Sequence, residues 1–476
     1  MKIAMIYLCD GWDYYPPMNL ITIISYVKSK LENVDIRIFD VNFGDIDKSL
    51  EKFQPDFVGF TCMSLEYTKT INKCKQLKKI LNVPFILGGV HISVLPNSLN
   101  PIFELGIIGE GEKTMLEIIN HFRDYNGFVK DKLIDINGIV YFDNNKLIKT
   151  EPRELINLKE LPKLDWKLIN PRTFSRRIAE NDYRKHACLL TSRGCPYRCR
   201  FCVSTNHWKT CRWLTAKQVV DEIKDLYHNH GIRSIWFSDD LFGYNIKRTK
   251  EITEMLRKEK ILGKIIFGCQ LRVNVVNDAM LGSLKELGIT HISFGFESGS
   301  SNYLSYLKRD KSLTVEDNKR AIQLCKKYGI KPGGTLIFGG ANETIQDMKQ
   351  TLDFIDYCIK ENVDNIGTFV MTPFPGSEMW EIAKARGKVS DNMDDWSKLN
   401  FANAKDAFLL DDNISKETFL EIFAKSRKKL GHFRKKRIIR LVTKHPIMIF
   451  LDVLRNPKYS FYSAMRVIGN KAKVGK

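Results

Sequence analysis

Two kinds of hydrophobic spacing alternate along the first 110 residues of the chain. Short apolar runs typical of buried strands are separated by longer segments in which apolar residues recur at helical spacing. We expect strands at Lys2–Leu8, Asp35–Phe39, Phe57–Thr61, Pro84–Leu87 and Leu105–Ile108. We expect helices at Leu20–Leu31, Asp45–Phe53 and Glu66–Leu81. This alternation predicts a parallel, doubly wound sheet, in which ligands bind beyond the carboxyl ends of the strands.

Small residues gather at three of these predicted strand ends. The clusters are Thr61-Cys-Met-Ser64, Gly88-Gly-Val-His91 and Gly109-Glu-Gly-Glu112. Glycine lets a bulky ligand approach the backbone closely. An ordinary turn explains any one of the clusters, but three on one edge of one sheet favour a binding crevice.

A second alternating series begins at His186, after a connector that contains a predicted hairpin. The hairpin strands are Asp135–Phe142 and Lys146–Lys149, with a turn at 143–145. Six strands are expected in the second series, at Cys188–Thr191, Ser234–Ser238, Ile265–Gln270, His291–Glu297, Pro332–Phe338 and Asn365–Met371. Helices are expected between them, at Thr215–His230, Lys247–Glu259, Asp278–Leu287, Thr314–Tyr328 and Thr344–Glu361. The series predicts an incomplete (β/α) barrel, with its active site at the carboxyl ends of the strands.

Polar residues occur at the carboxyl ends of these predicted strands. A cysteine-rich loop follows the first strand, and the later strand ends carry Asp239, Asp240, Gln270, Arg272, Glu297, Asn342, Glu343 and the segment 373–375. Taken singly, such charges are more often solvated loop residues. Taken together, they predict one polar barrel mouth.

The loop after the first strand holds three thiols within eight residues, Cys195, Cys199 and Cys202. This spacing suits a loop wrapped around a compact inorganic core. A 4Fe-4S cluster has four irons, so three cysteines leave one iron without a protein ligand, and an open coordination site is typical of catalysis. A zinc knuckle is the alternative, with His207 or Cys211 as its fourth ligand.

The composition is that of a soluble globular protein of two or three domains, with 476 residues, 43% hydrophobic and 27% charged. The other cysteines among the eleven are scattered, which favours a reducing cytosol over a disulfide framework. No apolar stretch reaches the length of a membrane-spanning helix.

Most of the net charge of +20 lies in the C-terminal tail, where Lys425 to Lys476 holds 16 Lys or Arg and one acid, Asp452. The charge therefore gives no reason to expect nucleic acid as a partner of the catalytic body. The tail combines basic residues with an apolar run, Pro446–Leu451, which is typical of helices that bind anionic lipid. A basic helix face packed on the barrel is the equally simple alternative.

These motifs together resemble the radical S-adenosylmethionine (SAM) superfamily, and within it the class that carries a cobalamin-binding domain. The cysteine loop resembles the CxxxCxxC motif of the superfamily, with Phe201 before the third cysteine. The N-terminal clusters resemble the cobalamin-binding domain, as does Pro16-Pro-Met-Asn-Leu20. Further matches are Ser238-Asp-Asp240, Gln270-Leu-Arg-Val273, Phe294-Gly-Phe-Glu-Ser-Gly299 and Pro373-Phe-Pro-Gly-Ser377, so that the resemblance covers roughly residues 1–387.

The resemblance implies the cofactors and their contacts. The three cysteines would hold a 4Fe-4S cluster whose open iron binds SAM, with Phe201 at the adenine of SAM and Asp240, Arg272 and Glu297 at its amino acid and ribose parts. A carboxylate suits an ammonium or hydroxyls, and an arginine suits a carboxylate. The implied cobalamin contacts are Thr61, Ser64, Gly88, Gly89, His91, Gly109, Glu110, Gly111 and Glu112.

Two departures from the family pattern accompany the resemblance. The first strand is not followed by an Asp-x-His-x-x-Gly motif, so we expect cobalamin to bind without a lower histidine ligand from that loop. Gly339-Gly-Ala-Asn-Glu343 stands where the family has a Gly-Leu-Pro-Gly-Glu-Thr run, so the loss of the proline affects the expected geometry of this loop.

The expected protein is thus α/β. A Rossmann-like, flavodoxin-like cobalamin-binding domain at 1–130 is followed by a linker with a hairpin at 131–180, a partial (β/α)6 radical SAM barrel at 181–390 and a basic, mainly helical C-terminal extension at 391–476. The resemblance implies cleavage of SAM to a 5′-deoxyadenosyl radical and transfer of a methyl group from methylcobalamin to an unactivated carbon. The expected partners are a small-molecule or lipid-like substrate and an external electron donor of the flavodoxin or ferredoxin type. The expected location is the cytoplasm, with peripheral contact to the inner face of the membrane left open.

Three other functions compete with this expectation. Some relatives cyclise or oxidise a ring instead of methylating it. A radical SAM methylthiotransferase acting on RNA would use a second cluster, for which Cys9, Cys62 and Cys74 are candidates, although buried thiols are the commoner outcome. A cluster protein for electron transfer is disfavoured, because electron carriers normally have a protein ligand on every iron of the cluster.

Overall fold

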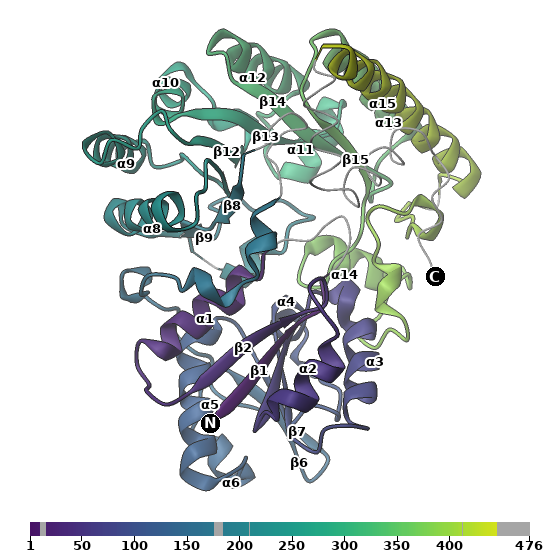
Figure 1. Ribbon diagram of the computed structural model, residues 1–476. Helices are drawn as coiled ribbons and strands as arrows, with labels where there is room; N and C mark the ends of the chain where they lie inside the picture. Colours follow the sequence, from purple (N-terminus) through teal and green to yellow (C-terminus); the bar gives the residue numbers. More distant parts are fainter. Residues whose placement is uncertain (10–15, 176–183, 209, 412, 445–476) are drawn as a thin grey trace.

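The computed structural model describes residues 1–9, 16–175, 184–208, 210–411 and 413–444. Two α/β bodies lie against each other in Figure 1, with the N-terminal sheet below and the second sheet above. The carboxyl ends of the N-terminal strands point toward the second body.

The N-terminal sheet has seven strands in the order β2-β1-β3-β4-β5-β6-β7. The strands are β1 Lys2–Tyr7, β2 Asp35–Asp40, β3 Phe57–Thr61, β4 Phe85–Gly88, β5 Leu105–Ile107, β6 Ile139–Asp143 and β7 Lys146–Lys149. The helices are α1 Met18–Lys28, α2 Ile46–Phe53, α3 Tyr67–Leu77, α4 Val90–Val94, α5 Gly111–Tyr125 and α6 Lys130–Leu133. The first five strands are parallel, which confirms the predicted flavodoxin-like arrangement.

Both faces of β1 are apolar, and helices cover this sheet on both sides. Ile3 and Met5 pack in the core with residues of α1 and α5, whereas Ala4 and Ile6 pack in the core with residues of α2 and α3. A parallel strand buried on both faces has no polar side, as the sequence of β1 shows.

The predicted hairpin is present, and it extends the N-terminal sheet. β6 pairs antiparallel with β5 and with β7. Its turn residues Asn144 and Asn145 have φ values of 45° and 63°, the left-handed conformation that two-residue hairpin turns require and asparagine tolerates. The hairpin therefore packs as the edge of the first sheet, and our boundaries between domains stay a prediction.

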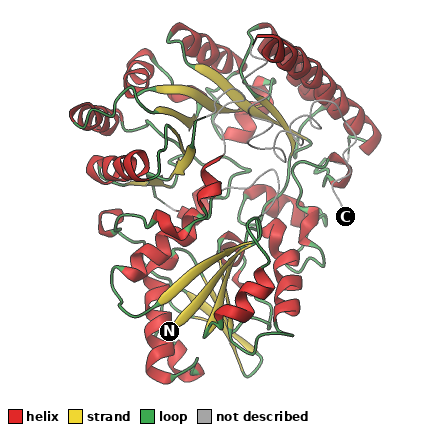
Figure 2. Cartoon of the chain, in the orientation of Figure 1, coloured by secondary structure: helices red, strands yellow, loops and turns green. Residues whose placement is uncertain are grey.

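The second sheet has six parallel strands in the order β15-β14-β13-β12-β11-β8, which confirms the predicted partial barrel. Its strands are β8 His186–Leu189, β11 Ser234–Phe237, β12 Ile266–Leu271, β13 Ile289–Glu297, β14 Lys331–Phe338 and β15 Ile366–Val370. Helices cover its outer face in Figure 2, and they are α8 Ala216–Asn229, α9 Ile246–Lys258, α10 Asp278–Leu287, α12 Val315–Lys327 and α13 Ile345–Lys360. Helices α4, α5 and α6 of the N-terminal body were not predicted from the sequence, and neither were β9 Ser192–Arg193, β10 Arg212–Trp213, α7 Ser204–Trp208, α11 Ser301–Lys308 and α14 Glu378–Ala385.

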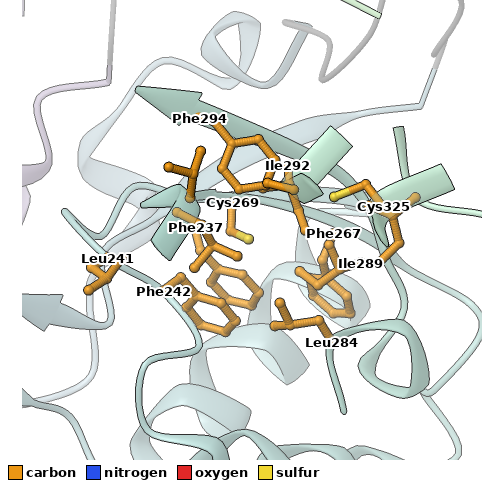
Figure 3. Close-up of a cluster of buried hydrophobic side chains, with 14 of the residues drawn as sticks. Phe237, Leu241, Phe242, Phe267, Cys269, Leu284, Ile289, Ile292, Phe294 and Cys325 are labelled. Carbon is orange, nitrogen blue, oxygen red and sulfur yellow. The ribbon is translucent and has the colours of Figure 1, made fainter. Parts of the chain in front are cut away.

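Aromatic rings fill the space between the barrel strands and their helices, as Figure 3 shows. The ring of Phe237 stacks on Phe242 at 4.0 Å between centroids and on Phe267 at 5.2 Å. The thiols of Cys269 and Cys325 are buried in the same cluster. These two cysteines are part of the hydrophobic core.

The C-terminal helix α15, Lys416–Lys444, lies along α13 on the outside of the barrel (Figure 1). Its basic side chains bind the barrel, because Lys429 pairs with Asp356 at 2.6 Å and Arg434 donates to the carbonyl of Ile366 at 2.6 Å. In the described part of the run, some basic side chains thus pack on the barrel, while Lys428, Lys435 and Lys436 are exposed. The apolar run Pro446–Leu451 lies outside the described residues. Within the described part of the chain, no helix is long and apolar enough to cross a membrane.

Candidate active site

The cysteine loop leaves from and returns to a two-stranded ribbon formed by β9 and β10. Arg193 of β9 lies opposite Arg212 of β10. Gly194 begins the loop with a φ of +90°, and a Cβ there would lie 2.1 Å from the carbonyl oxygen of Thr210, so only glycine fits. The buried carboxylate of Asp239 accepts hydrogen bonds from the N–H and hydroxyl groups of Thr191, at 2.5 and 2.6 Å. Asp239 thus fixes the strand end from which the ribbon starts.

The three predicted ligands line one cavity of about 430 Å³. Cys195, Cys199 and Cys202 are free thiols of intermediate exposure, and Cys211 lines the same cavity. Burial is the main cause that raises the pKa of Cys195, and it raises the pKa of Cys202 to about 12. Three soft thiol donors around one cavity fit an iron–sulfur cluster, whose binding would have to displace these thiol protons. Among the described residues, no three His, Cys, Asp or Glu side chains surround the position of a single metal ion.

Arg272 lies directly beside this loop. Its Nη1 is 3.4 Å from the Sγ atom of Cys199, its Nη2 donates to Asp310 at 2.9 Å, and its guanidinium covers the ring of Tyr197 at 4.1 Å. The structure brings Arg272 to the cysteines, as the sequence predicted for the site. Asp310 and Tyr197, which hold its guanidinium, were missed because neither belongs to a strand end.

Glu297 and Phe201, both predicted from the sequence, lie on either side of Lys308, which was not predicted. Lys308 pairs with Glu297 at 2.6 Å, and both side chains are only 6% exposed. The Lys308 ammonium also lies 5.5 Å from the centroid of Phe201, in the cysteine loop. Glu297 has a φ of +56° at an irregularity in the pairing of β13 with β14, which re-aims its side chain. A buried charge pair therefore lies beside the aromatic ring expected at the adenine of SAM.

The carboxylate of Asp240 accepts a hydrogen bond from the hydroxyl of Ser204 at 2.5 Å. Ser204 begins α7, the short helix after the third cysteine. Asp240 is therefore tied to the cysteine loop.

The glycines at the strand ends of the N-terminal sheet differ in whether the surrounding structure requires glycine. Gly89 has a φ of +100°, and a Cβ there would lie 2.6 Å from the carbonyl oxygen of Cys62. Gly109 has a φ of +80°, and a Cβ there would meet nothing within 4 Å. Thr61 is tied to the first turn of α1, since its hydroxyl accepts a hydrogen bond from the side-chain amide of Asn19 at 2.8 Å. The backbone at Gly109 is thus open to a ligand, and its contact with cobalamin stays a prediction.

Two family models match the two bodies. Residues 13–119 match the B12 binding domain, and residues 189–355 match the radical SAM superfamily. The chain belongs to the radical SAM enzymes that carry a B12-binding domain. Cobalamin, a 4Fe-4S cluster and SAM are therefore its cofactors, as predicted from the sequence.

This radical SAM enzyme is similar to curated proteins over most of its length. It is 29% identical to an uncharacterized methyltransferase of Pyrococcus horikoshii, covering 92% of this chain and 88% of that protein. It is 27% identical to the anaerobic magnesium-protoporphyrin IX monomethyl ester cyclase of Rubrivivax gelatinosus, covering 81% of this chain and 69% of that protein.

Two solved structures share its fold. OxsB, a cobalamin-dependent SAM radical enzyme solved with aqua-cobalamin and SAM bound, matches with a TM-score of 0.71 and 20% identity, covering 98% of this chain and 71% of OxsB. The radical SAM methyltransferase TsrM from Kitasatospora setae, solved with cobalamin and a 4Fe-4S cluster bound, matches with a TM-score of 0.65 and 19% identity, covering 81% of this chain and 75% of TsrM.

In the B12-binding domain of this enzyme, Ser64 and His91 lie in the interior. The two ring nitrogens of His91 are each 3.0 Å from a serine hydroxyl, of Ser64 and of Ser98. The His91 ring packs against Tyr67 and against Trp396 from the C-terminal region. Burial lowers the pKa of His91 to about 3, so the ring is neutral. With 0% and 5% exposure, His91 and Ser64 offer a ligand almost no surface, and we assign them a role in holding the loop.

The remaining predicted contacts surround the start of α5. A Cβ on Gly111 would lie 2.8 Å from Ile23 of α1, so this glycine lets two helices approach. The carboxylates of Glu110 and Glu112 are bound by arginines of the cysteine ribbon. Gly88 ends β4, and a Cβ there would make only an ordinary contact, 3.7 Å from the carbonyl oxygen of Phe60. The contacts of these four residues with cobalamin stay predictions, and for Glu110 and Glu112 they are limited to the backbone, because arginines hold their buried carboxylates.

Glu343 holds the loop that lacks the proline of the family pattern. Its side chain is buried, and its Oε2 accepts hydrogen bonds from the N–H groups of Gly339 at 2.5 Å and of Gly340 at 3.4 Å. Its Oε1 has no hydrogen-bond partner among the described residues. Burial raises the pKa of Glu343 to about 8. The carboxyl group, and not a proline, fixes this turn.

Because its pKa in the folded protein lies above 4.5, Glu343 contributes stability that is fully present below about pH 4.5 and is lost as the pH rises through about 8. Between these pH values the free energy of unfolding should fall by at most about 1.4 kcal/mol per pH unit because of Glu343. We expect Glu343→Gln, which resembles the protonated form, to lose this part of the slope. The pH dependence of stability is measured from the apparent melting midpoint of the apo-protein between roughly pH 5 and pH 9. The control Glu316→Gln, at a side chain 76% exposed, should keep the wild-type slope. Equal slopes for all three proteins would contradict the assignment.

Proposed function

We propose that this enzyme is a cobalamin-dependent radical SAM methyltransferase that methylates an unactivated carbon of a small-molecule substrate. The observation that carries the proposal is the closeness of its two cofactor-binding loops. A Cβ on Gly376, after the last barrel strand, would lie 3.0 Å from Val94 of α4 and 3.4 Å from Val203, which follows Cys202. One glycine thus touches both the helix behind the Gly88-Gly89 turn and the cysteine loop.

Relatives support methyl transfer over other outcomes. The relative that covers 92% of this chain is named a methyltransferase, and so are TsrM and the bacteriochlorophyllide d C-8(2)-methyltransferase of Chlorobaculum tepidum, which is 22% identical over 81% of this chain. TsrM was also solved with tryptophan as its substrate, which supports a small molecule as the substrate class. The cyclase similarity makes ring cyclisation the alternative outcome of the test below.

When bound, the reduced cluster and SAM supply a 5′-deoxyadenosyl radical and cobalamin supplies the methyl group. The residues of the chain bind and orient the cofactors and the substrate, and they exclude water from the site. Cys195, Cys199 and Cys202 would hold the cluster, and the buried Arg272 places a fixed positive charge beside Cys199. Glu297 and Lys308 neutralise each other in a buried ion pair next to Phe201, so their part is to hold the wall of the site beside the position expected for the adenine of SAM. Such prepositioning lowers the entropic cost of bringing reactants together.

The proposal is tested without knowing the substrate. The enzyme is reconstituted anaerobically with iron, sulfide and hydroxocobalamin, reduced, and given SAM deuterated in its methyl group. We expect the deuterated methyl group on cobalamin, together with S-adenosylhomocysteine, because a methyltransferase of this class must reload its cobalt from SAM. Formation of 5′-deoxyadenosine with no label on cobalamin would contradict methyl transfer and favour cyclisation or another radical reaction.

The source of electrons and the role of the tail are the finer parts of the proposal. We propose an external donor of the flavodoxin or ferredoxin type, because the reductive cleavage of SAM consumes single electrons that must be supplied to the cluster. Peripheral membrane contact through the tail stays a prediction for the residues after 444.

A further inference from the structure

Four charged residues join the B12-binding domain to the base of the cysteine loop. Glu110 and Glu112 lie at the start of α5, and Arg193 and Arg212 are the cross-strand pair of the ribbon from which the cysteine loop emerges. We call these four residues the clasp. The two halves of the clasp come from different domains.

The contacts within the clasp are specific. The guanidinium of Arg193 donates from Nη1 to Glu110 at 2.6 Å and from Nη2 to Glu112, so that it spans both carboxylates. Arg212 donates from Nη2 and Nη1 to the two oxygens of Glu110, at 2.8 and 3.1 Å. Planar guanidinium groups that bind carboxylates through two parallel bonds fix orientation as well as distance.

Burial makes the clasp sensitive to the loss of any charge. The side chains of Glu110 and Glu112 are 4% exposed and that of Arg193 is 8% exposed. Two acids and two bases balance, and the arginines lower the pKa of Glu110 in spite of its burial. Removal of one charge from such a group leaves its partner uncompensated in a medium of low dielectric constant. The clasp therefore holds only in one relative placement of the two domains.

The clasp is also close in sequence to both cofactor sites. Arg193 is two residues before Cys195, and Arg212 directly follows Cys211, which lines the cluster cavity. Glu110 follows Gly109, whose open surroundings are where cobalamin would fit. A shift of the clasp would move the cysteine loop relative to the B12-binding sheet.

We propose that the clasp sets the distance between cobalamin and the cluster, and that its four members are positioning residues for methyl transfer. This rests on the proposed function, because it assumes that both cofactors act on one substrate. Loss of a clasp carboxylate should leave each cofactor bound but let their separation vary. Because a misplacement of about 1 Å can cost on the order of a hundredfold in rate, we expect methylated product per 5′-deoxyadenosine to fall by about tenfold or more.

The test compares wild type with Glu110→Gln, Glu112→Gln and the control Glu117→Gln in the full chain, loaded with cluster and hydroxocobalamin. Glu117 lies on the same helix and pairs with Arg153, which is outside the cysteine ribbon. Cob(II)alamin and the reduced cluster are both paramagnetic, so the magnetic interaction between them, measured by electron paramagnetic resonance after dithionite reduction, reports their distance without any substrate. Iron and cobalamin contents are measured on the same samples.

We expect wild type and Glu117→Gln to have the same interaction, and both clasp variants to have a weaker or more widely spread one at unchanged iron and cobalamin contents. An unchanged interaction in the clasp variants would overturn the proposal. Loss of iron from them would also overturn it, because the clasp would then serve to fold the cysteine loop. A wild type that has the interaction but transfers no label from SAM would refute the proposed function and leave the clasp in place.

Discussion

Replacing Cys202 by alanine is expected to lower both bound iron and SAM cleavage to below about 1% of wild type. Removal of a residue that only supports a metal ligand costs about 10- to 100-fold in affinity, so loss of a ligand itself should cost more. The thiol is one of three around the cavity and has no substitute in the cluster motif. Iron content after anaerobic reconstitution and 5′-deoxyadenosine formation measure the effect.

The control is Cys211→Ser, which keeps a hydrogen-bond donor toward the carbonyl oxygen of Gly194, now 3.2 Å from the thiol. If three cysteines hold the cluster, this variant should keep about four irons per chain. Loss of iron from Cys211→Ser equal to that from Cys202→Ala would show a fourth cysteine ligand and contradict a cluster with an open iron, and bound zinc in place of iron in wild type would restore the zinc alternative. About eight irons in wild type would instead support a second cluster, as in a methylthiotransferase.

Lys308→Met is expected to lower the free energy of unfolding by about 3–5 kcal/mol, because it leaves the buried carboxylate of Glu297 without its partner. Methionine keeps most of the volume of the side chain, so the effect comes from charge and not from a cavity. Urea unfolding of the apo-protein, followed by circular dichroism, measures it.

The matched control is Lys217→Met, whose ion pair with Asp221 on α8 is 75% and 40% exposed. This change should stay within about 0.5 kcal/mol of wild type, since exposed pairs contribute little. The double variant Lys308→Met with Glu297→Gln should regain part of the loss. An effect of Lys308→Met no larger than the control would contradict the buried pair.

The order of elements could be read from the sequence because it depends on local spacing. The helix α10 and the strand β3 begin and end at the predicted residues, and asparagines mark the hairpin turn. In each case the signal is a period of 2 or 3.6, or a turn residue, within a few neighbouring positions. Short elements such as α11 and the ribbon β9–β10 were missed because a few residues carry too little periodicity, whereas the 15-residue helix α5 was missed although it is long enough to show helical spacing.

Side-chain partners were the part that the sequence could not supply. Glu110 and Glu112 were predicted as cobalamin contacts because they follow a strand end, yet their carboxylates bind Arg193, which is 83 and 81 residues away. The ring of Trp396 packs on His91, and the backbone N–H of Trp396 donates to the hydroxyl of Thr68, 328 residues away. No local pattern contains such pairings.

By itself the sequence determined the two α/β bodies and the three cysteines, because strand and helix spacing and the cysteine motif are local properties of the chain. Only the tertiary structure decided what holds the cysteine loop in place. Its ribbon, the clasp carboxylates and the Glu297–Lys308 pair come together from distant segments. Burial then makes those charges depend on one another, so that their partners follow from the packing of two domains and not from spacing along the chain.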